Sequence, residues 1–413
     1  MERPSGATWD PGRAYAGTHP YHNVGARGAM MRCDSVSPDL WNSFRKVPAC
    51  LALASLALLA MNSATQAAPH PPAGGKIAVE FDYSAAELMT DAIDRPALSQ
   101  AEAGALLQNR GIAAMVTKTG VFSPQSTPQG FVADMQSFVA SHRYPTGDFA
   151  LDWVYKYRAQ VKQLVSELRA DEDSLRHRMT ARLTRYAPRT GPATVRIYFV
   201  AGGMSDGFVL DDDPELALFV ALDKASGDKD GVEQNLTHEL YHVLQKLSAA
   251  GTPAAVKFAA KLETQPPLQR LLATTLWEGT ANLAADARET PGSGPYVSMW
   301  RDRYLRNLTP ERTRENFRLF DSVLVDLDQK KTDWDAAYRK GFSGNEDSRF
   351  YFVGMEMARA LAARGGAAYV EELFVRPPTR FFRDYFKLCD ADPQLPRFSA
   401  NTRRVIEKLP ASW

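Results

Sequence analysis

The chain has 413 residues, of which 45% are hydrophobic and 23% are charged. This balance is that of a soluble globular protein that can bury a sizeable core in one large domain or two ordinary ones. The formal net charge is +1, from 49 basic and 48 acidic side chains. Because so even a balance does not attract polyanions, we expect neither nucleic acid nor an anionic membrane surface as a partner.

A short apolar run near the N-terminus predicts a secretory signal. Residues 47–61 read VPACLALASLALLAM, the basic pair Arg45-Lys46 precedes them, and small residues follow. This is the order of a signal peptide, and the run is shorter than the roughly 20 apolar residues that span a membrane. We therefore predict cleavage after Ala67 or Ala68, export to the periplasm or the medium, and no stable membrane insertion afterwards. An uncleaved anchor is the alternative.

The chain is predicted to have three regions: a removed leader over 1–68, a helical N-terminal region over 69–190 and a catalytic region over 191–413. The stretch ahead of the signal is too long and too polar for a basic flank, so we expect translation to start at Met30 or Met31. Of the three cysteines, only Cys389 lies outside the leader. The mature chain can therefore form no intramolecular disulfide.

The N-terminal region shows helical patterns in chain order. Apolar residues recur at three- and four-residue spacing in 84–93, 101–111 and 130–142, which predicts short helices. The strongest pattern covers Trp153–Arg169, where one side carries Val154, Tyr157, Val161, Leu164, Val165 and Leu168. The basic run over 176–189 also has helical spacing, so we interpret it as a solvated helix face and not as a binding patch.

The pattern then changes to strands. VRIYFVA (195–201) and LALFVAL (216–222) are rich in β-branched and aromatic residues and are bounded by glycine-containing turns. The acidic triplet 211–213 lacks the alternating spacing of a calcium loop and is interpreted as a polar turn. After Gly231 the pattern is helical to the end. We therefore predict an α+β fold that is mostly α-helical, with a small sheet just before the next helix.

That helix carries His238-Glu239-Leu240-Tyr241-His242, an HExxH motif. On a helix with 3.6 residues per turn, positions four apart differ by about 40° in direction, so both imidazoles can reach one metal ion. The glutamate between them can hold a water on that metal. The helix itself is supported by an apolar stripe of Leu236, Leu240, Val243, Leu244 and Leu247.

A third ligand is predicted in the downstream segment WEGTANLAAD, where Glu278 lies in another helical pattern. Two histidines and one glutamate leave the fourth position of Zn²⁺ open for water, as a catalytic site requires. Asn282 and Asp286 share the helix face of Glu278. Either could accept a hydrogen bond from the outer nitrogen of a ligand histidine, or both could simply form a polar helix face.

HELYH followed by WEGTA resembles the gluzincins, zinc peptidases with HExxH on one helix and a glutamate ligand on a second. More narrowly, the span 195–385 resembles exported bacterial zinc-dependent peptidases of unknown specificity that carry HExxH…EGxA. The resemblance implies a gluzincin-like core with the sheet packed next to the HExxH helix. It also implies His238, His242 and Glu278 as zinc ligands and Glu239 as the catalytic base.

Two further expectations come from this resemblance. The strand LALFVAL would be the sheet edge along which an extended substrate lies, with plain core packing as the alternative. Tyr351, in RFYFVGMEMAR, would stabilise the oxyanion, with a role as a core aromatic as the alternative. The segment GGMSDG lacks the glutamate of an amine-binding motif, so we do not expect it to bind a substrate amine.

The predicted function is zinc-dependent hydrolysis of a peptide or protein substrate, with Glu239 activating a water on the metal. One alternative is a zinc-binding but non-catalytic scaffold protein of the envelope. A second alternative is a metal-free helical interaction protein in which HELYH is accidental.

Overall fold

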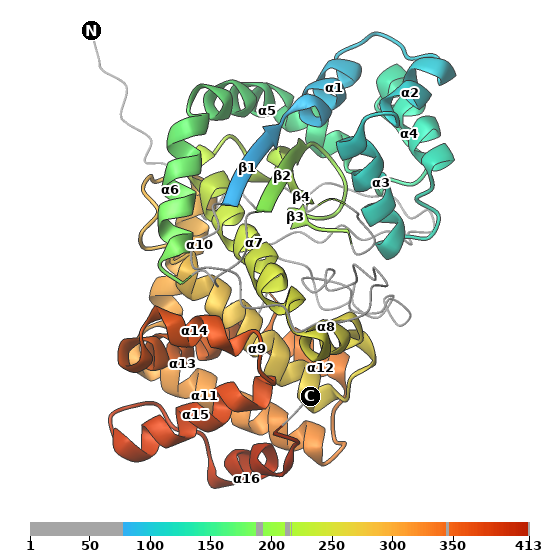
Figure 1. Ribbon diagram of the computed structural model, residues 1–413. Helices are drawn as coiled ribbons and strands as arrows, with labels where there is room; N and C mark the ends of the chain where they lie inside the picture. Colours follow the sequence, from blue (N-terminus) through green and yellow to red (C-terminus); the bar gives the residue numbers. More distant parts are fainter. Residues whose placement is uncertain (1–76, 187–192, 211–214, 216, 344–346, 412–413) are drawn as a thin grey trace, which may run out of the picture.

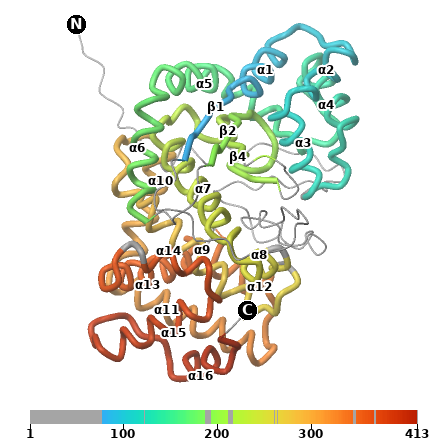
Figure 2. Tube along the Cα trace, viewed as in Figure 1, coloured from blue at the N-terminus to red at the C-terminus, as the bar shows by residue number. Residues whose placement is uncertain are grey.

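The computed structural model describes residues 77–186, 193–210, 215, 217–343 and 347–411. The predicted signal, the cleavage site and the acidic turn lie outside these residues. The described chain is mostly helical and contains a four-stranded mixed sheet, which confirms the α+β prediction. In Figure 1 the sheet lies with α1–α6 at one end of the molecule, α8, α9 and α11–α16 gather at the other, and α10 lies beside α7. Figure 2 traces the same division along the chain.

The sheet has the strand order β1-β2-β4-β3. β1 (Ile77–Asp82), β2 (Ala193–Val200) and β4 (Ala217–Ala221) run parallel, and β3 (Gly207–Phe208) pairs antiparallel with β4. The prediction that LALFVAL forms the sheet edge is wrong, because β4 has β2 on one side and β3 on the other. All five β4 residues are buried, as expected of a central strand, and the two edge strands are β1 and β3.

The N-terminal helices pack around this sheet. Helix α1 contacts β2, α3 contacts β2 and β4, and α6 contacts β1, while the later helix α7 contacts β3 and β4. The predicted helix over 101–111 is divided in two, since the Asn109 side chain accepts a hydrogen bond from the Ile112 N–H and so starts a new helix. These helices are α1 (Ser84–Ile93), α2 (Gln100–Leu106), α3 (Arg110–Phe122), α4 (Pro128–Ser141), α5 (Leu151–Ala170) and α6 (Glu172–Thr184).

The boundary predicted near residue 190 remains a prediction. Strand β1, from before that boundary, pairs along its whole length with β2, from after it. Helices α5 and α6 likewise contact α7 across it. The two predicted regions therefore share one sheet and one packed core.

Two arginines of the basic run in α6 contact residues of α7. The guanidinium of Arg178 donates hydrogen bonds to Glu233 (2.9 Å) and Asp171 (2.9 Å), and Arg182 donates to Gln234 (3.1 Å). The prediction of a solvated face is wrong for Arg182, whose Nε is buried, whereas the side chains of Arg178 and Arg185 are 35% and 54% exposed. Arg178 pairs with Glu233 of α7 because that carboxylate is 2% exposed, and a buried carboxylate needs a positive partner.

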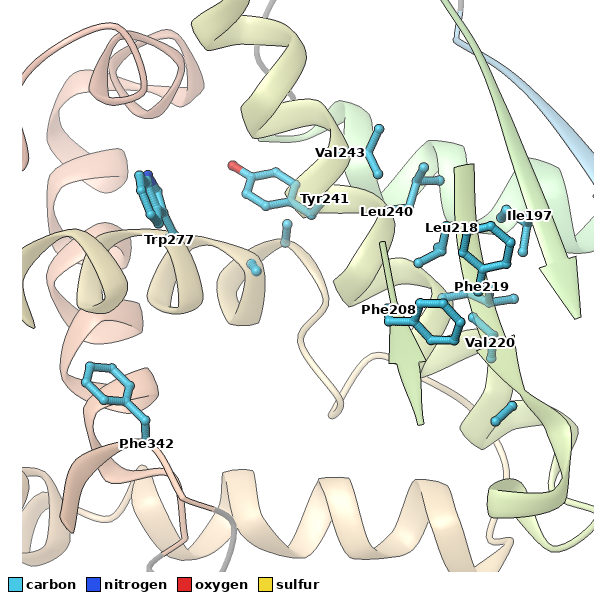
Figure 3. Close-up of a cluster of buried hydrophobic side chains, with 14 of the residues drawn as sticks. Ile197, Phe208, Leu218, Phe219, Val220, Leu240, Tyr241, Val243, Trp277 and Phe342 are labelled. Atoms are coloured by element: carbon cyan, nitrogen blue, oxygen red, sulfur yellow. The ribbon is translucent and has the colours of Figure 1, made fainter. Parts of the chain in front are cut away.

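Helix α7 (Lys229–Ala250) lies between the sheet and the C-terminal helices (Figure 1). Leu240 and Val243 point toward the sheet residues, whereas Tyr241 points to the opposite side (Figure 3). The helix begins at Asp228, whose carboxylate accepts from the N–H of Gly231 in α7 (3.0 Å). The same carboxylate accepts from the Val297 N–H in the first turn of α10 (2.8 Å). One side chain therefore caps two helices and ties them together.

Several C-terminal helices begin with proline, namely α8, α9, α10, α11 and α15. Proline suits the first helical turn because the N–H it lacks has no partner inside the helix.

Among the described residues, no helix is long and apolar enough to span a membrane. The remaining elements are η2 (Leu222–Ala225), α8 (Pro253–Ala260), η3 (Leu262–Thr264), α9 (Pro267–Ala284), α10 (Pro295–Asn307), α11 (Pro310–Asp328), α12 (Trp334–Gly341), α13 (Arg349–Gly365), α14 (Ala367–Leu373), α15 (Pro378–Ala391) and α16 (Ala400–Lys408).

Helices α9 and α13 cross backbone to backbone at two glycines. A Cβ on Gly354 would lie 2.0 Å from the Thr275 carbonyl oxygen, and a Cβ on Gly279 would lie 2.4 Å from the Gly354 Cα. Both contacted atoms belong to the backbone, so a side chain at either glycine would require one of the two helices to shift. This contact explains the glycine that follows Glu278 and the glycine that lies three residues after Tyr351.

We predict that Gly354→Ala lowers the free energy of unfolding by about 1–3 kcal/mol or more, because the added methyl group overpacks the crossing. The control is Gly104→Ala in α2, where a Cβ would meet nothing within 4 Å. Alanine should stabilise that helix by about 0.5–1 kcal/mol. Urea unfolding of the metal-free proteins, followed by circular dichroism, measures both changes. Equal midpoints for Gly354→Ala and the wild type would contradict the close crossing.

Candidate metal centre

Three predicted ligands meet between α7 and α9. His238 and His242 lie one turn apart on α7, and Glu278 projects from α9. The Nε2 atoms of the two histidines are 3.2 Å apart. Oε2 of Glu278 is 3.3 Å from Nε2 of His238 and 3.4 Å from Nε2 of His242. These residues form a group that could hold a metal ion.

The spacing of these three atoms fits zinc. Three corners of a tetrahedron with zinc–ligand bonds of about 2.0–2.1 Å lie about 3.3–3.4 Å apart. The three observed distances, 3.2, 3.3 and 3.4 Å, agree with this value on every edge. Two imidazole nitrogens and one carboxylate oxygen are also the donor set of catalytic zinc sites that keep the fourth position for water.

The carboxylate of Glu278 is fully buried, and its charge interacts with the two histidines. Burial alone would raise the pKa of Glu278, but the positive charge of His242 and hydrogen bonds from both imidazoles lower it to about 2. Burial likewise opposes a charged His242, but the Glu278 carboxylate outweighs it and raises the pKa of His242 to about 9. The metal-free site therefore holds a negative carboxylate against a positive imidazole at neutral pH.

Gln245 contacts a ligand and was not predicted. Its Oε1 lies 2.9 Å from Nδ1 of His242, the ring nitrogen that faces away from the other ligands. Its Nε2 donates to the Trp277 carbonyl (2.9 Å) and to the Thr280 hydroxyl (2.9 Å) on α9. The available signal was its position three residues after His242, which places both on one helix face.

Asn282 lies on α9, but the helix ends at Ala284, so the prediction that Asp286 shares the helix face of Glu278 is wrong. Asp286 pairs with Arg288 through distances of 2.5 and 3.0 Å. Asn282 is 1% exposed, and its amide atoms have no hydrogen-bond partner among the described residues. Nδ1 of His238 likewise has no hydrogen-bond partner among the residues that the structure describes. Their orienting roles therefore remain predictions.

Glu239 is half-buried and lies against the edge strand. A Cβ on Gly207 in β3 would be 3.2 Å from Cγ and 3.6 Å from Cδ of Glu239. The absence of a side chain at Gly207 thus leaves room for this glutamate beside the end of the sheet. Glu239 is also close enough for its charge to raise the pKa of His242.

Two aromatic rings flank His238. The Tyr351 ring stacks on the imidazole, with an angle of 6° between the ring planes and centroids 6.2 Å apart. Burial and the charge of Glu278 raise the pKa of Tyr351 well above its usual value, so its hydroxyl keeps its proton. The Trp300 ring, from α10, lies 5.9 Å from the imidazole on a tilted plane. Trp300 was not predicted, since nothing in its local sequence links it to the HExxH helix.

The fold and this donor set define the site as a candidate catalytic zinc centre of the HExxH type. The family described as "Putative zinc dependent peptidase (DUF5700)" matches residues 105–394. Because this match covers more than half of the 413 residues, the chain belongs to that family. No curated protein and no solved structure matches the chain.

Proposed function

We propose that the protein is an exported zinc metallopeptidase of the gluzincin type. The observation that carries the proposal is the convergence of His238, His242 and Glu278, whose donor atoms are 3.2–3.4 Å apart. The description of the family as zinc dependent supports the proposal. The position of β3 at the end of the strand order, beside Glu239, adds further support, because an extended peptide can pair with the edge strand of a sheet.

In this proposal the bound metal and Glu239 have separate roles in the hydrolysis. When bound, zinc would supply a Lewis acid that polarises the scissile carbonyl and lowers the pKa of a water. Glu239 takes the proton of that attacking water and passes it to the leaving amine, which balances the protons of the hydrolysis. Glu239 is half-buried and lies beside β3, the strand along which the proposed substrate would extend.

Tyr351 is proposed to donate a hydrogen bond to the developing oxyanion. Its raised pKa keeps the hydroxyl protonated, and its ring lies next to His238. The close crossing of α9 and α13 holds Tyr351 near Glu278 before any substrate binds. A donor fixed in advance stabilises charge that appears only in the transition state.

We predict that Glu239→Gln retains one zinc per chain but loses at least about 100-fold in kcat, because general-base catalysis contributes about 10²–10⁴. His238→Ala should lose both zinc and activity. Elemental analysis and cleavage of casein measure the two properties separately. Wild-type turnover by Glu239→Gln would refute the mechanism, and a zinc-loaded but inert wild type would favour the non-catalytic scaffold.

For Tyr351→Phe we expect kcat to fall about 10²–10³-fold, the range for loss of one oxyanion donor. KM, zinc content and the melting temperature should change little, since the ring is retained. Steady-state kinetics on a fluorogenic peptide measures the split between kcat and KM. An unchanged kcat would assign Tyr351 to core packing alone.

Export is proposed from the apolar run over 47–61 and its flanks. When the full chain is produced in a bacterium, the mature protein should be outside the cytoplasm and begin at Ala68 or Pro69. N-terminal sequencing of each cell fraction measures this. Leu56→Arg interrupts the apolar run and should leave an unprocessed cytoplasmic chain. An unprocessed wild-type chain in the cytoplasm would contradict the proposal.

A further inference from the structure

The side chain of Gln245 has a fixed orientation. The Trp277 carbonyl can only accept a hydrogen bond, so the group 2.9 Å from it must be the NH₂ of Gln245. The Thr280 hydroxyl gives its own proton to the Leu276 carbonyl (2.8 Å), so it also accepts from that NH₂. Both donors of the amide therefore point to α9. Its oxygen must point to His242.

This orientation decides which nitrogen of His242 carries a proton. The Gln245 oxygen is an acceptor, so Nδ1 of His242, at 2.9 Å, must be the donor. In the neutral ring the lone pair is then on Nε2, the atom that faces His238 and Glu278. A ligand histidine must present a lone pair to the metal in this way.

The two α9 partners of Gln245 lie on both sides of the third ligand. Trp277 directly precedes Glu278, and Thr280 follows it by two residues. Gln245 is 5% exposed, so little water competes for these bonds. One amide therefore joins the His242 ring to the turn of α9 that carries Glu278.

We propose that Gln245 is a positioning residue of the metal centre, which holds His242 in the Nδ1–H tautomer and sets its distance from Glu278. The inference rests on the proposed zinc function. Outer hydrogen bonds of this kind orient ligand histidines, and their loss typically weakens metal binding 10–100-fold. His238 has no such bond among the described residues, so the protein orients the two histidines differently.

The test measures the zinc dissociation constant by competition with a chromophoric chelator. Gln245→Met keeps the length of the side chain but removes the acceptor, and it should weaken zinc binding about 10–100-fold. Gln245→Glu restores an acceptor for Nδ1 and should bind zinc within a few-fold of the wild type. A purely structural role would not produce this rescue, because the carboxylate cannot donate to the Trp277 carbonyl.

Gln234 provides a matched control. It is a fully buried glutamine on the same helix, and its amide donates to the Ala285 carbonyl (2.5 Å) while its oxygen accepts from Arg182 (3.1 Å). Its hydrogen bonds with the described residues go to Ala285, Arg182 and Thr290 and to no ligand, so Gln234→Met should lower the melting temperature without changing the zinc dissociation constant of the folded protein.

The possible outcomes separate the two proposals. If Gln245→Met binds zinc as tightly as the wild type, or if Gln245→Glu is as weak as Gln245→Met, the positioning role is wrong. A wild type that binds zinc but cleaves no peptide overturns the peptidase proposal alone. A wild type that binds no zinc overturns both.

Discussion

The buried charge of Glu278 is the constraint on which the site depends. Removing a carboxylate from water costs several kcal/mol even after relaxation of the protein, unless positive charge compensates it. Here the compensation comes from the imidazoles of His238 and His242, whose nitrogens lie 3.3 and 3.4 Å away. In the metal-free protein the Glu278 carboxylate raises the pKa of His242, which favours the positively charged imidazole beside it. A divalent cation at the same point would replace that proton.

Such a site requires α7 and α9 to be held at a fixed separation, and the rest of the fold provides this. One face of α7 packs on the sheet (Figure 3), and its opposite face carries residues that contact α9. The double cap by Asp228 attaches α10 to the start of α7. At the other side of the site, the glycine crossing of α9 and α13 prevents α9 from moving away. The ligands therefore lie at the junction of the sheet and the helical end of the molecule.

Features that depend on local spacing could be predicted. The histidine pair follows from the helical repeat, and both strands with strong β patterning are present as β2 and β4. The two other strands were missed for different reasons. β3 has only two residues and no periodic pattern. β1 is short and mixes apolar and acidic residues, and it becomes a strand because β2 pairs with it.

By itself, the sequence determined the HExxH helix and the ligand types, because these depend on residue identity and on separations of four positions along one helix. Tertiary structure decided the edge strand beside Glu239, the bonds from Gln245 to α9, the pairing of Arg178 with Glu233 and the need for glycine at positions 279 and 354. Each of these is a contact between segments far apart in the chain. Helical or strand periodicity describes only which face of an element is apolar, not which distant element will cover it.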